Sequence, residues 1–189
     1  MSAPFLMGRL RAPVSPDDHL QGPPDAPVTL VEYGDYECPF CGEAYYVVKD
    51  LQARFPEELR FAFRNFPLAS IHPHAQDAAF AAEAAALQGS FWPMHDRLYE
   101  SQDALEPSDL LAHAEALGLH VMQLEEDARS STVRERVRAD FLGGVRSGVN
   151  GTPTFFVNGA RHEGSYRFDD LADSIAAARD GRPMRSPTI

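Results

Sequence analysis

The stretch Val28–Gly42, which reads VTLVEYGDYECPFCG, carries the strongest structural and chemical signals in the chain. Its first six residues form a β-branched and aromatic run that is typical of a buried strand. Cys38 and Cys41 follow almost at once, and Pro39 stands where its missing N–H suits the first position of a helix. The pattern therefore predicts a strand that leads into a helix with a C-x-x-C pair at its start.

The residues after this stretch continue a strand–helix–strand order. Apolar side chains recur at helical spacing from Ala44 to Phe55, and Pro56 ends the run. Residues 59–64 then alternate between large apolar side chains and basic or small ones, which predicts a second strand.

Residues 74–146 differ from this pattern, because they show successive helical segments and no strand signal of any strength. The helices are expected at 75–88, 91–99, 110–117 and 133–145. The strand pattern returns at Thr154–Val157, and Asn158-Gly159 is a strong hairpin signal that predicts a partner strand at 160–163. Apolar spacing over 168–178 indicates a closing amphipathic helix.

We therefore predict an α/β fold in which a mixed central sheet is split by an inserted α-helical domain. The expected organisation is an irregular lead-in at 1–26 with a short strand near Leu10, sheet-domain parts at 27–67 and 148–181, a helical insertion at 68–147, and a tail at 182–189.

Composition narrows the class of function. The 189 residues include 17 Lys or Arg and 28 Asp or Glu, for a net charge of −11 without a basic stripe, which argues against nucleic acid and anionic membranes as partners.

No apolar run is long enough to span a membrane. Arg9 and Arg11 interrupt the short apolar stretch at the start, so we expect no signal peptide and a cytoplasmic protein. Export to the periplasm is the alternative if the start is misassigned or a leader was removed.

The two cysteines, three residues apart, are better suited to reaction than to stabilisation, because a disulfide that closes so small a loop adds little. At the positive end of the helix dipole, Cys38 should form a thiolate with a pKa of roughly 3.5 to 7.5, which makes it the attacking sulfur. Cys41 would then resolve the mixed disulfide. The alternative is a zinc site completed by His72 and His74, but we expect no metal.

Two further positions are candidates with open alternatives. Glu32 lies within an apolar strand, in step with Leu30; if that face is buried, its pKa rises and it can exchange a proton with Cys41. If the strand lies at an edge, Glu32 is an ordinary solvated acid. The Thr152-Pro153 bond is either a cis peptide in a tight turn or a trans proline that opens a strand.

Three blocks of sequence resemble DsbA-like proteins of the thioredoxin superfamily, including the DsbA-like domains found free or attached behind bacterial sodium/proton antiporters. They are Val28–Gly42, Phe63–Ala75 (FRNFPLASIHPHA) and Ser147–Gly159 (SGVNGTPTFFVNG), and the resemblance extends over about residues 10 to 179. It implies a thioredoxin-like fold, with the helical block as a cap beside the active site.

The resemblance also implies roles for individual residues. Cys38 would be the exposed nucleophile, Cys41 the buried resolving thiol and Glu32 the acid beneath them. Pro153 would be a cis-proline that faces the disulfide, and the backbone of Thr152 would bind an extended substrate segment. Pro39 and Phe40 complete the expected substrate-binding set.

One departure from the best-known family member affects the expected chemistry. Phe40 stands where that protein has a histidine between the cysteines, so its strong oxidising power is not implied here. The missing export signal likewise conflicts with a periplasmic oxidase.

The expected function is thus that of a protein-disulfide oxidoreductase that exchanges disulfides with protein thiols. We expect no cofactor beyond the redox-active Cys38–Cys41 disulfide, an unidentified redox partner, and a monomer, because the chain has no room for a separate dimerisation domain. The alternatives are a glutathione-dependent isomerase and a redox-inert or regulatory module that accompanies a membrane transporter.

Overall fold

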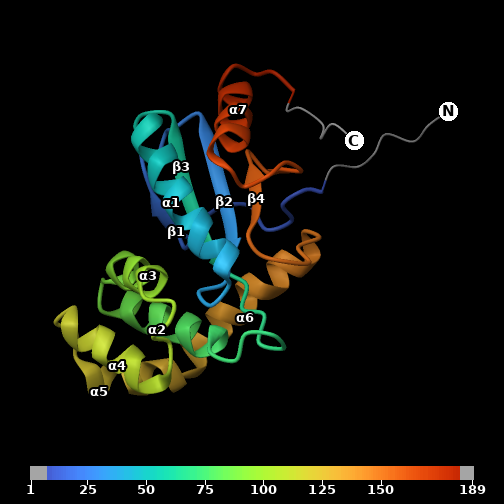
Figure 1. Cartoon of the computed structure of the whole chain (residues 1–189). Coiled ribbons are helices and arrows are strands. Elements are labelled where there is room, and N and C mark those ends of the chain that lie inside the picture. Colours follow the sequence, from blue (N-terminus) through green and yellow to red (C-terminus); the bar gives the residue numbers. More distant parts are fainter. Residues whose placement is uncertain (1–7, 184–189) are drawn as a thin grey trace.

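A five-stranded mixed sheet in the order β1–β3–β2–β4–β5 forms the centre of the molecule (Figure 1). The strands are β1 His19–Gln21, β2 Val28–Gly34, β3 Leu59–Asn65, β4 Thr154–Val157 and β5 Ala160–Arg161. The computed structural model describes residues 8–183. Strands β2 and β3 are parallel and the other pairs are antiparallel. Helix α1, Pro39–Arg54, supplies the crossover that a parallel pair requires.

Five helices are inserted between β3 and β4, and we call them the helical insertion. They are α2 Ala75–Leu87, α3 Phe91–Glu100, α4 Pro107–Ala116, α5 Val121–Arg129 and α6 Ser131–Arg146. Figure 1 shows α2–α5 gathered beyond one end of the sheet, with α6 running from that group toward β4. Helix α7, Phe168–Arg179, follows β5. The predicted α/β fold with a mixed sheet and inserted helices is confirmed.

Both faces of the sheet are buried, which explains why β2 reads as an almost continuous apolar run. One face packs Leu30 and Phe63 against side chains of α1, α3 and α7. The opposite face packs Tyr33 and Phe156 with Phe66 and with Phe141 of α6. Side chains alternate along β2, so Glu32 belongs to the first face, beside the start of α1.

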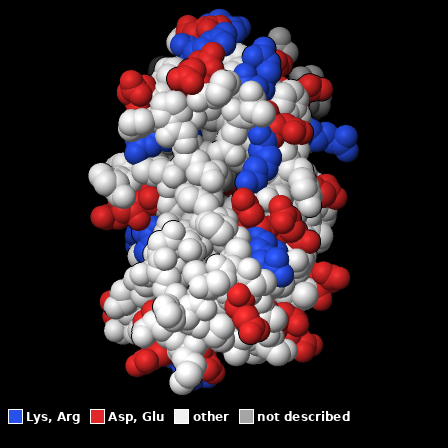
Figure 2. Space-filling view, turned by 90° about the vertical axis from the view of Figure 1, so that its left-hand side faces the viewer, with Lys and Arg blue, Asp and Glu red and all other residues white. Residues whose placement is uncertain are grey.

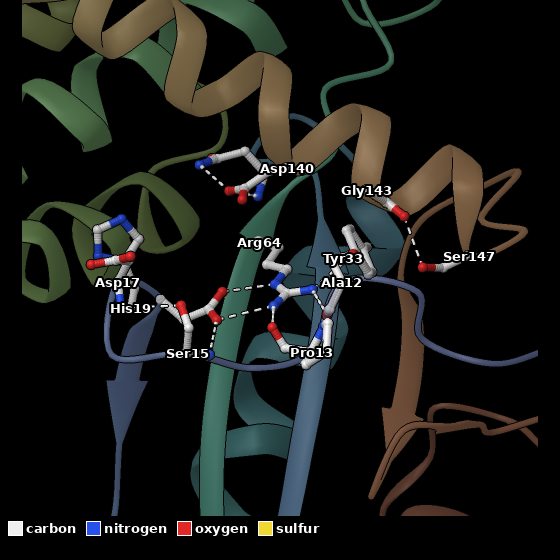
Figure 3. Close-up of polar contacts among 12 residues, drawn as sticks. Ala12, Pro13, Ser15, Asp17, His19, Tyr33, Arg64, Asp140, Gly143 and Ser147 are labelled. Atoms are coloured by element: carbon white, nitrogen blue, oxygen red, sulfur yellow. Dashed lines mark hydrogen bonds and ion pairs between the residues drawn. The ribbon is translucent and has the colours of Figure 1, made fainter.

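A buried ion pair lies on the α6 side of the sheet (Figure 3). Arg64 donates from Nε and Nη2 to the two carboxylate oxygens of Asp18, at 2.7 and 3.0 Å. Its remaining N–H groups donate to the backbone carbonyls of Ala12 and Pro13 and to the hydroxyl of Tyr33. Each side-chain nitrogen of Arg64 therefore has a partner, and this pair ties the N-terminal segment to β3.

Three details differ from the predictions. Strand β1 lies inside the segment expected to be irregular, because His19, Leu20 and Gln21 pair with β3 although they follow a stretch rich in Pro and Asp. No strand forms at Leu10; instead Arg9 makes an isolated bridge to Ala160. Helix α5 was not predicted as a separate element. Residues 1–7 and 184–189, parts of the expected lead-in and tail, lie outside the described residues.

The hairpin prediction at Asn158-Gly159 is confirmed. Both residues have positive φ, 47° and 79°, as a type I′ turn requires. The Asn158 side chain also accepts from the backbone N–H of Thr29 and donates to the carbonyl of Pro27, which fixes this turn against the start of β2.

Charged side chains are dispersed over the face shown in Figure 2. Basic and acidic groups alternate around an uncharged centre and form no continuous basic patch there. No helix within residues 8–183 combines the length and apolarity needed to cross a bilayer.

Candidate active site

The helix that carries the cysteines begins as the sequence predicts. Cys38 is the N-cap residue of α1, with extended backbone angles, and Pro39 occupies the first turn. The Cys38 carbonyl accepts the first helical hydrogen bond, from the Gly42 N–H at 3.1 Å. The sulfur of Cys38 thus lies beside the N–H groups at the positive end of the helix.

The expectation of an exposed Cys38 is wrong, because only 3% of the residue is accessible. The loop before β4 covers it: the Cys38 thiol lies 3.4 Å from the Thr152 carbonyl and donates to it. Access to the sulfur is therefore restricted on the side of this loop.

The surroundings of Cys38 favour its thiolate. Its pKa is lowered to about 6, first by the hydrogen bond from the Cys41 thiol. Burial opposes ionisation, but the Thr152 side chain and the N–H groups of Phe40 and Cys41 lower the pKa further. The Thr152 hydroxyl has no hydrogen-bond partner when Cys38 is a neutral thiol, so it is free to serve the thiolate. At neutral pH the sulfur is mainly ionised.

Cys41 has the opposite character. It is completely buried, and burial is the main reason that its pKa lies well above the ordinary thiol value. Its hydrogen bond to Cys38 and the nearby charges of Glu32 and Cys38 raise the pKa further. The two sulfurs are therefore a stabilised thiolate and a thiol that needs a base before it can attack.

Glu32 is the nearest candidate for that base. It is 2% exposed, so the buried alternative considered for this residue is the correct one. Burial, and secondarily the charge of Cys38, raises its pKa to about 8. Its Oε1 atom has no hydrogen-bond partner. A carboxyl of this kind titrates near neutral pH and can accept or return a proton.

The expected substrate-binding residues lie in the first turn of α1 and in the loop before β4. The Thr152–Pro153 peptide bond is cis, as the resemblance implies. Phe40 is 55% exposed, and its ring lies 6.5 Å from that of Tyr166. The Tyr166 hydroxyl donates to Glu43 of α1 at 2.7 Å. A cavity of about 260 Å³ lined by residues 153–155 and 161–166 adjoins this edge.

Two acidic residues anchor the segment that follows β3 to the active-site loop. The buried carboxylate of Asp35 accepts from the Leu68 backbone N–H and lies 2.8 Å from His72 Nδ1. Glu37 accepts from the backbone N–H of His74 at 2.6 Å. His72 is therefore directed to a carboxylate rather than to the sulfurs. Among residues 8–183, no group of three or more His, Cys, Asp or Glu side chains is placed to hold a metal ion.

The helical insertion also reaches the cysteine loop. The Gln102 amide donates to the carbonyl of Tyr36 at 2.7 Å and to that of Cys38 at 2.9 Å. Its amide oxygen lies against Gly42, where any Cβ would collide with it. A side chain at position 42 would therefore displace the Gln102 amide from its hydrogen bonds to Tyr36 and Cys38.

The family model described as "Thioredoxin" matches residues 14–177. The chain belongs to the thioredoxin family. Among solved structures, this DsbA-like member superimposes on a thioredoxin-like oxidoreductase from Silicibacter pomeroyi DSS-3 with a TM-score of 0.80 and 30% identity, over 88% of this chain and 94% of that one. Oxidised BdbD from Bacillus subtilis gives 0.77 and 27% identity, over 87% and 94%. Wolbachia pipientis alpha-DsbA1 gives 0.76 at 20% identity, over 91% and 95%, and supports the fold alone.

The DsbA-like protein also matches longer proteins. It is 48% identical over 93% of its length to "Na(+)/H(+) antiporter NhaA 1" of Salinispora arenicola, and 46% identical over 96% to the protein of that name in Mycolicibacterium vanbaalenii. The chain spans only 27% and 30% of these relatives. It corresponds to one part of each of them.

Sequence reasoning missed three residues of this DsbA-like site. Asp35 and Gln102 hold backbone segments around Cys38, and burial together with the charges of Cys41 and Glu32 raises the pKa of Tyr99 of α3. Asp35 lies between the strand and the cysteines, so its position in the sequence could have marked it. Gln102 and Tyr99 come from the helical insertion, and no local pattern connects them to the cysteines.

Proposed function

We propose that this protein is a thiol–disulfide oxidoreductase that exchanges disulfides with protein substrates through Cys38 and Cys41. The observation that carries the proposal is the asymmetry of the pair: a sulfur whose pKa is lowered to about 6 stands against one whose pKa is raised. A structural pair has no need of this difference, whereas exchange needs one ready nucleophile and one sulfur held in reserve.

In the reducing direction the Cys38 thiolate attacks a substrate disulfide. A Cys38–substrate disulfide forms, and the other substrate sulfur leaves as a thiolate. Cys41 then transfers its proton to Glu32 and attacks the Cys38 sulfur, which releases the second substrate thiolate and leaves a Cys38–Cys41 disulfide. Two electrons pass from the protein to the substrate. Oxidation of a substrate dithiol is the same sequence reversed.

The groups beside Cys38 support a polypeptide substrate. An extended segment can pair with the backbone at Thr152, a half-buried residue, next to Pro153 and the exposed ring of Phe40. The likeness to a thioredoxin-like oxidoreductase and to BdbD adds support.

A trapping experiment tests the proposal. We expect Cys41→Ser to accumulate mixed disulfides between Cys38 and disulfide-containing proteins, because Cys38 can still attack but the resolving sulfur is gone. Dithiothreitol should release these adducts. Cys38→Ser is the matched control and should give none. Failure of wild type to reduce insulin, together with no adducts in Cys41→Ser, would reject the proposal.

A regulatory module attached to a transporter is the second candidate, favoured by the match to part of two antiporters. The thiolate absorbance of Cys38 separates the two functions. A pKa near 6 and a disulfide that forms reversibly in a glutathione buffer support exchange. An ordinary thiol pKa with no reversible disulfide would favour the module. The cytoplasmic location and the monomeric state stay predictions.

A further inference from the structure

Two buried polar atoms beneath the cysteines lack hydrogen-bond partners. One is Oε1 of Glu32, and the other is the hydroxyl of Tyr99, on the last turn of α3. Both residues are almost completely buried, at 2% and 4% exposure. An unpaired polar group in a protein interior costs about 1–3 kcal/mol, so two such groups in one region require an explanation.

The position of Gly34 shows that these two groups are neighbours. Gly34 follows Glu32 by two residues on β2, so the two positions face the same side, about 6.6 Å apart along the strand. The Tyr99 hydroxyl lies 2.8 Å from where a Cβ on Gly34 would be. The hydroxyl thus shares the place of the next side chain along from Glu32 with the Phe63 ring, whose edge lies 2.5 Å from the same point. A contact through one water or a small rotation lies within this distance.

The other neighbours of Glu32 offer no competing donor on the adjacent strands. Its partners in register are Phe63 on β3 and Phe155 on β4, whose side chains carry no hydrogen-bonding group. The titratable groups that face Glu32 and Tyr99 from other elements are Cys38 and Cys41 of α1, Asp35 and Tyr36 of the intervening loop, and Tyr45 and His95 in the ring stack.

These groups are engaged elsewhere. The Tyr36 hydroxyl is bonded to His95 Nδ1 at 3.1 Å, and the Tyr45 hydroxyl donates to Glu100 at 3.0 Å. Asp35 accepts backbone and histidine hydrogen bonds. In the stack formed by Tyr36, Tyr45 and Tyr99, only the hydroxyl of Tyr99 is left without a partner.

We infer that Tyr99 is a positioning residue of the exchange reaction, whose hydroxyl donates a hydrogen bond to the ionised Glu32 carboxylate. The inference rests on the proposed function and adds to it a contribution from the helical insertion. Glu32 must be ionised to accept the Cys41 proton, yet burial favours its neutral form. A hydrogen bond that forms only to the carboxylate increases the ionised fraction. Tyr99 keeps its own proton throughout, and the proton that moves passes from Cys41 Sγ to Glu32.

The test compares Tyr99→Phe with Tyr45→Phe, which removes a hydroxyl from the same ring stack but one that faces Glu100. The Glu32 carboxyl is titrated in the reduced protein by carbon-detected NMR, with Glu32→Gln used to assign its signal. We expect Glu32 in Tyr99→Phe to hold its proton about tenfold more tightly, and to be unchanged in Tyr45→Phe.

Kinetics give a second readout. The pH profile of the resolving step should move to higher pH in Tyr99→Phe, and Tyr99→Phe should have no further effect in a Glu32→Gln background. A folded Tyr99→Phe protein in which Glu32 titrates as in wild type would overturn the inference. Failure of the proposed function is recognised separately, because wild type would then show no exchange while the NMR titration, which needs no activity, still decides whether the two residues are paired.

Discussion

Each face of the central sheet contains a buried carboxylate, but only one of the two carboxylates is paired with a cation. On the α6 side, Asp18 has the Arg64 guanidinium on both of its oxygens (Figure 3). On the α1 side, Glu32 is even more buried, but no ion pair is formed by it within residues 8–183 and one of its oxygens has no partner there. A satisfied buried group holds the fold together, whereas an unsatisfied one beside two cysteines is available for chemistry.

The two carboxylates also change the stability of the protein with pH in opposite directions. Burial disfavours the charge of Asp18, but the Arg64 bonds, the Ser15 N–H and the charges of Arg64 and Arg136 outweigh it and lower the pKa. Asp18 therefore contributes stability above its unfolded pKa, and the contribution is lost as the pH falls through the folded value. The pKa of Glu32 is raised to about 8, so the folded state holds a proton that the unfolded state releases. Stability from Glu32 falls as the pH rises from about 4.5 to about 8.

The largest expected effect comes from breaking the ion pair between Asp18 and Arg64. Asp18→Asn leaves the buried Arg64 charge without its counter-ion and should lower the free energy of unfolding by about 3 kcal/mol in urea denaturation at pH 7. Asp17→Asn, at an exposed neighbour, is the control and should change it by less than about 0.5 kcal/mol. Equal effects of the two substitutions would show that the ion pair is not a structural anchor.

Removing the ionisable group of Glu32, on the α1 side of the sheet, should raise the stability of the protein rather than lower it. Glu32→Gln cannot ionise, so its stability relative to wild type should rise by about 2–3 kcal/mol between pH 5 and pH 7, the slope expected for one proton. Unfolding curves at several pH values measure this. The exchange rate should fall by about a hundredfold with the loss of the base. Parallel stability profiles for the two proteins would mean that the Glu32 pKa is not raised.

The smallest expected effects are those of Tyr33→Phe and Tyr99→Phe on the free energy of unfolding. The Tyr33 hydroxyl accepts from Arg64 at 3.1 Å, so Tyr33→Phe should cost about 1 kcal/mol of unfolding free energy. Tyr99→Phe removes a hydroxyl without a partner and should cost less than about 0.5 kcal/mol at pH 5, where Glu32 is neutral. A greater loss for Tyr99→Phe would show that its hydroxyl is already bonded in the resting protein.

The local parts of this fold could be predicted from sequence because their signals are local. The β-branched run at Val28, the proline after Cys38 and the Asn158-Gly159 turn each specify a backbone conformation within a few residues. Strand β1 could not be recognised, since its three residues become a strand only by pairing with β3.

The features of the candidate site also fall into those that the sequence could predict and those that it could not. The cysteines, Glu32 and Pro153 could be found from their spacing and from family resemblance. The burial of Cys38 could not, because a carbonyl more than a hundred residues away covers the sulfur. Gly42 is a local trace of a long-range contact, and its meaning is seen once Gln102 lies against it.

Gln102 has one more consequence. Its amide ties the main chain at Tyr36 and Cys38 to the turn between α3 and α4, so the position of the Cys38 backbone depends on a segment far from it in the sequence. On the proposed function, substitutions in the turn after α3 would then change the reduction potential of the cysteine pair without any change in the C-P-F-C sequence. Two homologues with identical dithiol motifs therefore need not share a reduction potential.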